Sequence, residues 1–421
     1  MRHLILGAGP AGVIAAETIR RHAPADEILI VGDEPEPPYS RMAIPYLLDG
    51  QVGEPGTYLR HEPGHYERLR IGLRSGVRAT AVDTVTRRVA LSDGSSEGYD
   101  RLLIATGSTP MKPPIRGIHA AGVHTCWTLA DARAIAQRAQ RGARVLQMGA
   151  GFIGCIIMEA LAARGVQLTV VEMGDRMVPR MMGPTAGGMI RDWCEAHGVR
   201  VRTGTRVEAI EPHAPLRVRL SDGSHFEADL VINATGVKPA IGFLEHSTVK
   251  CLLGVLTDEH MQTTVPGVYA AGDCAEAFDK VSGRTIVSAI QPNAADQARV
   301  AALNMVGRKA TLRGVTQINV LDTLGLVSAS FGDWQGVPGG EHVELTDRAA
   351  HRHLSLRFAA DRLVGCNSIG WTDHLGAMRG LVEGQVPLGE WKQRLLADPT
   401  QLMPAYLACA QAQHARATLR R

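Results

Sequence analysis

The chain has 421 residues, of which 45% are hydrophobic and 21% are charged, and its formal net charge is +3. This composition is that of an ordinary globular protein, and the length predicts two to four domains with sizeable cores. The small net charge gives no reason to expect a nucleic acid or an anionic lipid surface as a partner.

The cysteines and the start of the chain predict a cellular setting. Seven scattered cysteines form no CxxC pair: Cys126, Cys155, Cys194, Cys251, Cys274, Cys366 and Cys409. This pattern favours a reduced, cytoplasmic setting. Met1-Arg2 leads directly into a strand pattern, and no apolar stretch reaches the ~18 residues of a membrane span. We therefore expect a protein that is neither exported nor embedded in a membrane.

A glycine fingerprint, GAGPAG, opens the chain with Gly7, Gly9 and Gly12. It follows the apolar run His3–Leu6 and begins a helical pattern, which is the strand-turn-helix context of a dinucleotide site. The first glycine allows a tight turn, the second lets backbone N–H groups approach a diphosphate, and the third lets the helix pack on the strand.

A second fingerprint of the same design, GAGFIG, contains Gly149, Gly151 and Gly154 after the apolar run Val145–Met148. Two such motifs in one chain predict two bound dinucleotides rather than one.

Each fingerprint is followed by an acidic residue at the end of the next predicted strand. Asp33 or Glu34 takes this place in the first half, and Glu172 takes it in the second. A carboxylate there accepts hydrogen bonds from ribose hydroxyls, and at Glu172 it would repel the 2′-phosphate of NADPH. The sequence therefore favours NADH over NADPH, with Arg176 as the residue that could still help to bind a phosphate.

An internal repeat predicts the architecture. Leu91–Gly107 and Leu220–Gly236 have equal length and nine identical residues, and each contains an Asp-Gly turn signal and an apolar strand that runs into Ala-Thr-Gly. A further apolar strand, Gly267–Ala271, runs into Gly272-Asp273-Cys274. The second nucleotide domain is thus predicted to be inserted into the first.

The pattern changes after Lys309. Thr316–Phe331 and His342–Gly365 are predicted to be rich in strands, and Asp373–Val382 and Leu388–Leu395 to be helical. These segments predict a third domain without a fingerprint. We assign no function to the end of the chain, 411–421.

Together these motifs resemble the two-dinucleotide flavoprotein oxidoreductases, the pyridine nucleotide-disulfide reductase superfamily. The motifs that carry the resemblance are GAGPAG, the two ATG strands, GAGFIG with Glu172, and GVYAAGDCAE, and they cover about residues 1–310. The resemblance implies an α/β fold: two Rossmann-like dinucleotide-binding domains, with the NAD domain inserted into the FAD domain, and a C-terminal α+β domain.

The domain boundaries that we expect are 1–112 and 244–312 for FAD, 113–243 for NAD(H), and 313–421 for the C-terminal interface or acceptor domain. By resemblance, the residues that would contact FAD are Gly7, Gly9, Pro10, Ala11, Gly12, Asp33, Glu34, Arg41, Ala79, Ala105, Thr106, Gly107, Gly272 and Asp273. Those that would contact the nicotinamide nucleotide are Gly149, Gly151, Ile153, Gly154, Glu172 and Gly236.

Three residues are candidates for the chemistry itself. Phe152 matches an aromatic residue that related enzymes hold over the flavin, Glu159 matches a glutamate near the nicotinamide, and Tyr46 stands where one branch of the family carries a lysine near the flavin. The alternatives are a core aromatic for Phe152 and an ordinary acid on a helix face for Glu159.

A missing cysteine narrows the reaction. In the disulfide-reducing members a cysteine follows the second strand of the FAD domain, whereas this chain has Met42 in the stretch Ser40–Tyr46. A thioether cannot form a thiolate, so dithiol chemistry is not expected. Cys155 and Cys274 adjoin the nucleotide motifs, and we interpret them as packed apolar thiols.

Pro37–Arg41 resembles the branch that reduces ferredoxins and rubredoxins, although Tyr46 and Trp127 depart from its pattern. Ile44–Tyr46 and Thr316–Phe331 are closer to the coenzyme A-disulfide reductase and NADH oxidase branch.

The predicted function is that of an FAD-dependent oxidoreductase. It would take a hydride from NADH and pass single electrons to a small iron–sulfur carrier protein. The alternatives are an NADH oxidase or a reductase of a quinone or small disulfide, and a flavin-bearing subunit or redox sensor of a larger complex. A homodimer or a larger complex is compatible with the sequence, and no metal site is expected.

Two further features stay open. The window Arg60–Arg88 holds seven arginines, which either bind an acidic partner or form a solvated face. Trp371 either lies on an electron exit path or packs in a core or an interface.

Overall fold

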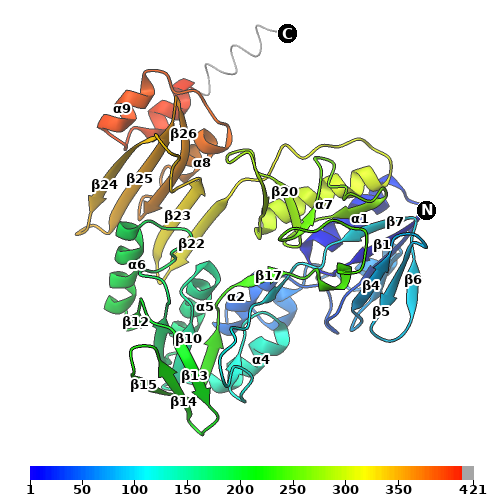
Figure 1. Ribbon diagram of the computed structural model, residues 1–421, viewed down its shortest axis with the longest axis horizontal. Coiled ribbons are helices and arrows are strands. Elements are labelled where there is room, and N and C mark those ends of the chain that lie inside the picture. Colours follow the sequence, from blue (N-terminus) through cyan, green and yellow to red (C-terminus); the bar gives the residue numbers. More distant parts are fainter. Residues whose placement is uncertain (410–421) are drawn as a thin grey trace. The chain divides into compact units, whose positions relative to one another are not determined.

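The computed structural model describes residues 1–409, and the chain forms two units assembled from distant segments (Figure 1). The first unit combines three segments, Met1–Leu47, Val52–Thr109 and Val237–Val315. The second combines Leu48–Gln51, Pro110–Gly236 and the chain from Thr316 onward. The second fingerprint therefore lies in a segment that interrupts the first unit, as predicted. The end of the chain, 411–421, lies outside the described residues.

Five parallel strands form the central sheet of the first unit, in the order β19-β7-β1-β2-β3. They are β1 (Arg2–Leu6), β2 (Glu27–Val31), β3 (Ile71–Arg74), β7 (Arg101–Ile104) and β19 (Val268–Ala270). Leu6 at the end of β1 pairs with Val31 and Ile104, so three strands end at one level. The chain passes from β1 to β2 on one side and later to β7 on the other, and open α/β sheets bind ligands at such a switch point.

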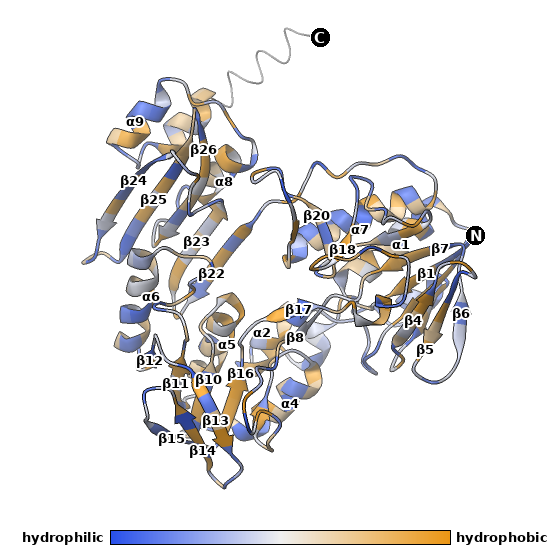
Figure 2. Ribbon diagram, in the orientation of Figure 1, coloured by the Kyte–Doolittle hydropathy of each residue, from blue (hydrophilic) through white to orange (hydrophobic). Residues whose placement is uncertain are grey.

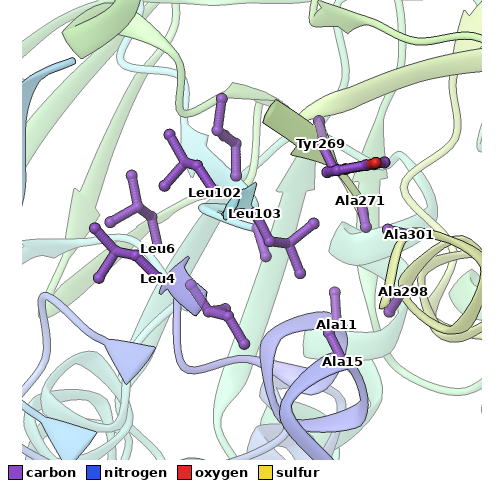
Figure 3. Packing of buried hydrophobic residues seen from close by; sticks show 14 of the residues in the cluster. Leu4, Leu6, Ala11, Ala15, Leu102, Leu103, Tyr269, Ala271, Ala298 and Ala301 are labelled. Carbon is purple, nitrogen blue, oxygen red and sulfur yellow. The ribbon is translucent and has the colours of Figure 1, made fainter. Parts of the chain in front are cut away.

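Two helices, α1 (Pro10–His22) and α7 (Gln291–Met305), pack together next to this sheet. Figure 3 shows their alanines, Ala11 and Ala15 from α1 and Ala298 and Ala301 from α7, on the side of the sheet to which Leu103 points, while the other labelled leucines of the sheet point to the opposite side. Small side chains allow helices to approach closely. The start of α1 packs against β1, because a Cβ on Gly12 would lie 3.3 Å from Ile5 Cγ2.

The second unit repeats this design. Its parallel sheet has the order β12-β11-β10-β16-β9. The strands are β9 (Val123–His124), β10 (Arg144–Met148), β11 (Gln167–Val171), β12 (Arg200–Arg202) and β16 (Leu230–Asn233), and the helices are α4 (Leu129–Arg138), α5 (Phe152–Ala163) and α6 (Pro184–Ala196). Met148 pairs with Val171 and Asn233, just as Leu6 pairs in the first sheet. Figure 2 shows β10 and β16 in mostly hydrophobic colours, which fits strands covered on both faces.

Each copy of the internal repeat ends in a parallel strand, β7 or β16, and its turn and the strand before that belong to one of two small antiparallel sheets of equal design. They are β4 (Ala79–Asp83), β5 (Arg88–Leu91) and β6 (Ser96–Gly98), and β13 (Val207–Glu211), β14 (Leu216–Leu220) and β15 (His225–Ala228). The Asp-Gly turns adopt the same left-handed conformation, with φ of 84° at Gly94 and 83° at Gly223. The turn signal thus correctly predicted the hairpins.

An antiparallel sheet of order β22-β23-β26-β25-β24 follows Val315. Its strands are β22 (Ile318–Thr323), β23 (Leu326–Gly332), β24 (Glu341–Asp347), β25 (Arg352–Ala359) and β26 (Arg362–Ile369), followed by α8 (Leu375–Glu383) and α9 (Trp391–Ala397). Asn367 of β26 is buried, donates to the Met181 carbonyl at 3.0 Å and accepts from the Gly183 N–H at 2.9 Å. These bonds tie the sheet to the nucleotide-binding part of the same unit.

The remaining elements are short. They are α2 (Ile44–Leu48), α3 (His65–Arg68), the 3-10 turns Arg41–Ala43, Glu54–Thr57 and Gly242–Leu244, and the strands β8 (Ser108–Pro110), β17 (Val237–Pro239), β18 (Val255–Leu256), β20 (Ala275–Phe278) and β21 (Thr285–Val287). Within residues 1–409, no helix combines the length and the hydropathy needed to cross a membrane.

Candidate functional site

The first fingerprint leaves open space at its second glycine, which suits a diphosphate. Gly7 has a φ of 116°, and a Cβ there would lie 2.1 Å from the Ala105 carbonyl oxygen. A Cβ on Gly12 would lie 2.0 Å from the Gly7 oxygen, whereas a Cβ on Gly9 would meet nothing within 4 Å. Packing therefore requires glycine at the first and third positions, and the second position faces open space.

The second fingerprint has the same geometry. Gly149 has a φ of 98°, and a Cβ on it would lie 2.4 Å from the Ala234 oxygen. A Cβ on Gly154 would lie 2.6 Å from the Gly149 oxygen, and one on Gly151 would meet nothing within 4 Å. Both loops thus leave room at the position where a backbone approaches a pyrophosphate.

The helices that follow the two loops offer their N-termini to a ligand. α1 has 13 residues and is preceded by Gly9, and α5 has 12 residues and is preceded by Gly151. Glycine has no side chain with which to cap the N–H groups of the first turn, so these donors and the positive end of the helix dipole remain for an anion. The residues present fit two dinucleotide diphosphates.

Two predicted FAD residues bind each other in the first unit. The half-buried Glu34 accepts hydrogen bonds from Tyr39 Oη at 2.6 Å and from Arg41 Nη2 at 2.7 Å. Arg41 Nη1 also donates to Tyr39 Oη at 3.1 Å. Asp33, the other predicted carboxylate, is exposed. The loop that carries them lies against the first fingerprint, because a Cβ on Gly32 would be 2.9 Å from the Ala8 methyl.

Asp273 joins the third segment of the first unit to the same region. Ser108 Oγ donates to its carboxylate at 2.8 Å. Burial raises the pKa of Asp273, while the bond from Ser108 and the charge of Arg41 act in the opposite direction. The preceding Gly272 has a φ of 83°, and a Cβ on it would lie 3.4 Å from the Ala11 methyl of α1. Gly272-Asp273 and the first fingerprint are therefore neighbours.

The other predicted FAD contacts lie in the same unit. The Ala105 N–H donates to the Leu6 carbonyl at 2.8 Å, and Thr106 Oγ1 donates to the Ala240 carbonyl at 2.9 Å. Gly107 follows with a φ of 67°. Ala79 is buried at the start of β4, in the antiparallel sheet. The Ala-Thr-Gly end of β7 is thus brought beside the first glycine.

Glu172 is held by the second fingerprint. Its carboxylate accepts from the Ala150 N–H and from the Gly174 N–H, each at 2.7 Å. Arg176 instead directs its guanidinium at its own loop, to the oxygens of Met182, Asp175 and Pro179. This arrangement favours a ribose hydroxyl at Glu172 and gives no support to a phosphate site at Arg176.

Of the three candidates for the chemistry, Phe152 and Glu159 lie in the second unit and Tyr46 lies in the first. Phe152 is the first residue of α5 and is half-buried, with Ile153 next to it, and Gly236 adopts a φ of 121° after β16. Glu159, on α5, is half-buried. Burial is the main cause of its raised pKa, followed by the charges of Asp322 and Asp49. Tyr46 belongs to the first unit and is 52% exposed.

The cysteines beside the nucleotide motifs are buried. Cys155 and Cys274 are fully buried, and Cys274 Sγ lies 3.4 Å from the carbonyl oxygens of Ile104 and Ala271. Burial raises the pKa of both thiols, so neither forms a thiolate readily. This agrees with their interpretation as packed apolar thiols, and Met42, where a reactive cysteine would lie, is exposed. Among residues 1–409, no group of three or more side chains suits a metal ion.

Three of the seven arginines in the arginine-rich window form ion pairs within the chain. Arg60 binds Glu17 with two bonds of 2.6 Å, and Arg68 binds Glu62. Arg74 bridges Asp93 and Glu97. This pairing favours a solvated face over a docking site for an acidic protein. Trp371 is half-buried, and its indole Nε1 is a buried atom without a hydrogen-bond partner in the described part of the chain.

Two residues with roles at the nucleotide loops were missed from the sequence. Gln147 reaches both outer glycines of the second fingerprint, and Asn367 holds the loop after Glu172. A signal for Gln147 was present, because a polar residue in the middle of an apolar strand needs a partner. Asn367 carried no local signal.

This fold and these two loops define a protein that binds two dinucleotides. The family profile "Pyridine nucleotide-disulphide oxidoreductase" matches residues 1–299. The chain belongs to this family. Membership confirms the predicted superfamily, the α/β fold class and the prediction of an FAD- and NADH-dependent oxidoreductase.

Three curated relatives are similar over most of the chain. The epsilon subunit of NADH-dependent phenylglyoxylate dehydrogenase from Aromatoleum evansii is 32% identical over 402 residues, 94% of this chain and 95% of that subunit. The NADH oxidase of Methanocaldococcus jannaschii is 32% identical, and the match covers 74% of this chain and 71% of that oxidase. The biphenyl dioxygenase system ferredoxin–NAD(+) reductase of Paraburkholderia xenovorans is 33% identical, and the match covers 64% of this chain and 66% of that reductase.

A solved structure extends the likeness to the whole fold. The covalent complex of putidaredoxin reductase with putidaredoxin matches with a TM-score of 0.89 and 25% identity, over 97% of this chain and 99% of the matched chain. The likeness therefore includes the antiparallel sheet after Val315, which the family profile does not cover.

Proposed function

We propose that the chain oxidises NADH at the second fingerprint and delivers the electrons, through FAD at the first, to a small iron–sulfur protein. The observation that carries this proposal is the pair of loops with the same geometry, each with an open second glycine before an uncapped helix. NADH gives up one hydride, so its two electrons leave singly to two carrier molecules. FAD, when bound, supplies both the two-electron and the one-electron chemistry.

The residues of the chain would position both nucleotides. In the first unit, the first-turn N–H groups of α1 would hold a diphosphate, Glu34 would bind a ribose, and Asp273 would bind the ribityl chain. In the second, the N-terminus of α5 would hold the other diphosphate and Glu172 would accept bonds from the 2′-hydroxyl. Phe152, half-buried at the start of α5, would cover the flavin until the nicotinamide displaces it.

The proposed acceptor is supported by what the relatives are called. One is a ferredoxin–NAD(+) reductase, and one matched structure is a reductase bound to putidaredoxin. The burial of Cys155 and Cys274 also supports electron transfer that does not pass through a dithiol of this chain.

A second candidate function is that of a flavin-bearing subunit of a larger enzyme. The observation in its favour is the match with the phenylglyoxylate dehydrogenase subunit, which extends over nearly the full length of both chains. In this case the iron–sulfur acceptor would be another subunit of the complex. NADH oxidase remains the alternative when oxygen takes the electrons.

Anaerobic stopped-flow mixing of the flavin-loaded protein with NADH tests the proposal. The flavin absorbance should bleach within one turnover, and a ferredoxin or rubredoxin added afterwards should restore it. A flavin that stays oxidised would contradict the proposal, and rapid oxygen consumption without a carrier would favour the oxidase. Low turnover of the isolated chain with an artificial acceptor would favour the subunit.

We also propose the boundaries 1–112 with 244–312, 113–243, and 313–421 for three domains. Limited proteolysis should cut near these boundaries.

A homodimer is the proposed state of the isolated chain, and light scattering tests it. The scattered cysteines support a reduced, cytoplasmic setting, which fractionation of cells tests.

A further inference from the structure

Gln147 braces the second fingerprint from below. It lies in β10, two residues before Gly149, and its side chain is fully buried. Its Nε2 donates to the carbonyl oxygens of both Gly149 and Gly154 at 2.9 Å. The opposite orientation of the amide would place Oε1 against two carbonyl oxygens, so these bonds determine which way the group points.

The brace has a cost. Gln147 Oε1 is buried and has no hydrogen-bond partner within residues 1–409. A buried acceptor without a partner destabilises a fold. A glutamine whose role was only to fill space would therefore be inferior to an aliphatic residue at this position.

The first fingerprint shows that the fold accepts such a residue. Ile5 holds the matching place, two residues before Gly7, and it is also fully buried. A Cβ on Gly12 would lie 3.3 Å from Ile5 Cγ2, and a Cβ on Gly154 would lie 3.1 Å from Gln147 Nε2. The two side chains occupy the same site of two matching loops, and only one of them makes hydrogen bonds.

If the proposed function is correct, the difference between Gln147 and Ile5 matches a difference in how long the two nucleotides stay bound. A flavin stays in its site through many turnovers, so its diphosphate keeps the first loop in shape. NADH arrives and leaves in every turnover, so the second loop must hold its shape while it is empty. A loop that has to be ordered on binding loses affinity.

We infer that Gln147 is a positioning residue that preorganises the NADH-binding loop through its two bonds to the glycine carbonyls. It does not contact the reacting atoms. Its effect is on the binding of NADH and not on the binding of FAD.

Kinetics of the flavin-loaded enzyme test this inference. Gln147→Ile installs the side chain of the matching site, and Gln147→Met is an unbranched alternative in case the first variant is poorly packed. With an artificial acceptor, KM for NADH should rise about tenfold, which corresponds to about 1.4 kcal/mol. Both kcat and the flavin content should stay within about twofold of the wild type.

Leu146→Val is the matched control, because Leu146 is equally buried in the same strand and does not bond to the glycines. It should leave KM for NADH unchanged. An equal rise in the control, an unchanged KM in both Gln147 variants, or loss of FAD from both would overturn the inference.

Hydrogen exchange gives a readout that does not depend on turnover. In Gln147→Ile without nucleotide, the segment 149–155 should exchange faster than in the wild type, and saturating NAD+ should restore its protection. The segment 7–13 should be unchanged. Wild-type exchange in the empty variant, or exchange that NAD+ does not slow, would overturn the inference.

These outcomes separate the two proposals. A wild-type flavin that NADH does not reduce would overturn the proposed function itself. A wild type that is reduced, with variants of unchanged KM, would overturn only the role of Gln147.

Discussion

Arg41 donates from Nη2 to Glu34 Oε1 across 2.7 Å, so two residues predicted to bind the same cofactor orient each other. Both are partly exposed, with side-chain exposures of 34% and 21%. A pair of this kind contributes little to stability, so its main effect is on the direction in which the two groups point.

We expect Glu34→Gln to weaken FAD binding about tenfold, since it removes a charged acceptor of ribose hydroxyls. The stability of the apoprotein should change by less than about 1 kcal/mol. Titration of the apoprotein with FAD, followed by flavin fluorescence, measures the affinity. Asp33→Asn is the control on the neighbouring exposed carboxylate, and a larger loss there would show that Asp33 is the ribose ligand.

Glu172→Gln should relax the choice of nucleotide. Removing the negative charge lowers the repulsion of a 2′-phosphate, so the ratio of kcat/KM for NADH over NADPH should fall about tenfold. Asp175→Asn removes a neighbouring negative charge three positions after Glu172, and it should leave the ratio unchanged. If Arg176→Ala abolished residual activity with NADPH, the view that its guanidinium is used within its own loop would be wrong.

Asp273→Asn should stabilise the apoprotein while it weakens FAD binding. Burial raises the pKa of Asp273 above its ordinary value of 3.8. The stability that a group with a raised pKa contributes is fully present when the pH is below the pKa of the group in the unfolded chain. It is lost as the pH rises through the pKa in the folded protein. Near pH 7 the flavin-free variant should therefore melt at a higher temperature than the flavin-free wild type. Its melting temperature should also change less with pH. A lower melting temperature of the flavin-free variant would contradict this.

His3 should make the first unit sensitive to mild acid. It is fully buried, with Nε2 2.8 Å from Asp26 Oδ2, and burial lowers its pKa from 6.5 although Asp26 acts in the opposite direction. The stability that neutral His3 contributes is then present when the pH is above the pKa of this residue in the unfolded chain. It is lost as the pH falls through the pKa in the folded protein. Urea unfolding at about pH 7 and about pH 5 should show a smaller loss for His3→Gln than for the wild type. His61→Gln, on the surface, should behave as the wild type.

The cysteines should be dispensable. Cys155→Ala and Cys274→Ala should keep NADH-driven reduction of an artificial acceptor within about twofold, because neither thiol takes part in electron transfer. In the native protein a thiol reagent should react first with Cys251, which is half-buried while the other cysteines of residues 1–409 are buried. Loss of turnover in an alanine variant that retains FAD would restore a thiol mechanism.

Much of the fold could be predicted because its signals are local. The two fingerprints, the Asp-Gly hairpins and the Ala-Thr-Gly strands are short patterns whose residues are needed for backbone reasons, such as the φ of 116° at Gly7. The place of the sheet after Val315 was harder to predict, because this sheet belongs to the same unit as the second fingerprint. Asn367 supplies part of that grouping through bonds to residues almost two hundred positions away.

The sequence by itself determined that there are two nucleotide loops, that one is inserted into the other domain, and that no cysteine follows the second strand, because each of these is written in contiguous residues. Only the tertiary structure decided which side chains hold the loops: Arg41 against Glu34, Glu172 on the Ala150 N–H, and Gln147 beneath Gly149 and Gly154. A hydrogen bond depends on distance and direction within a fraction of an ångström, and residue types and spacing do not specify either one.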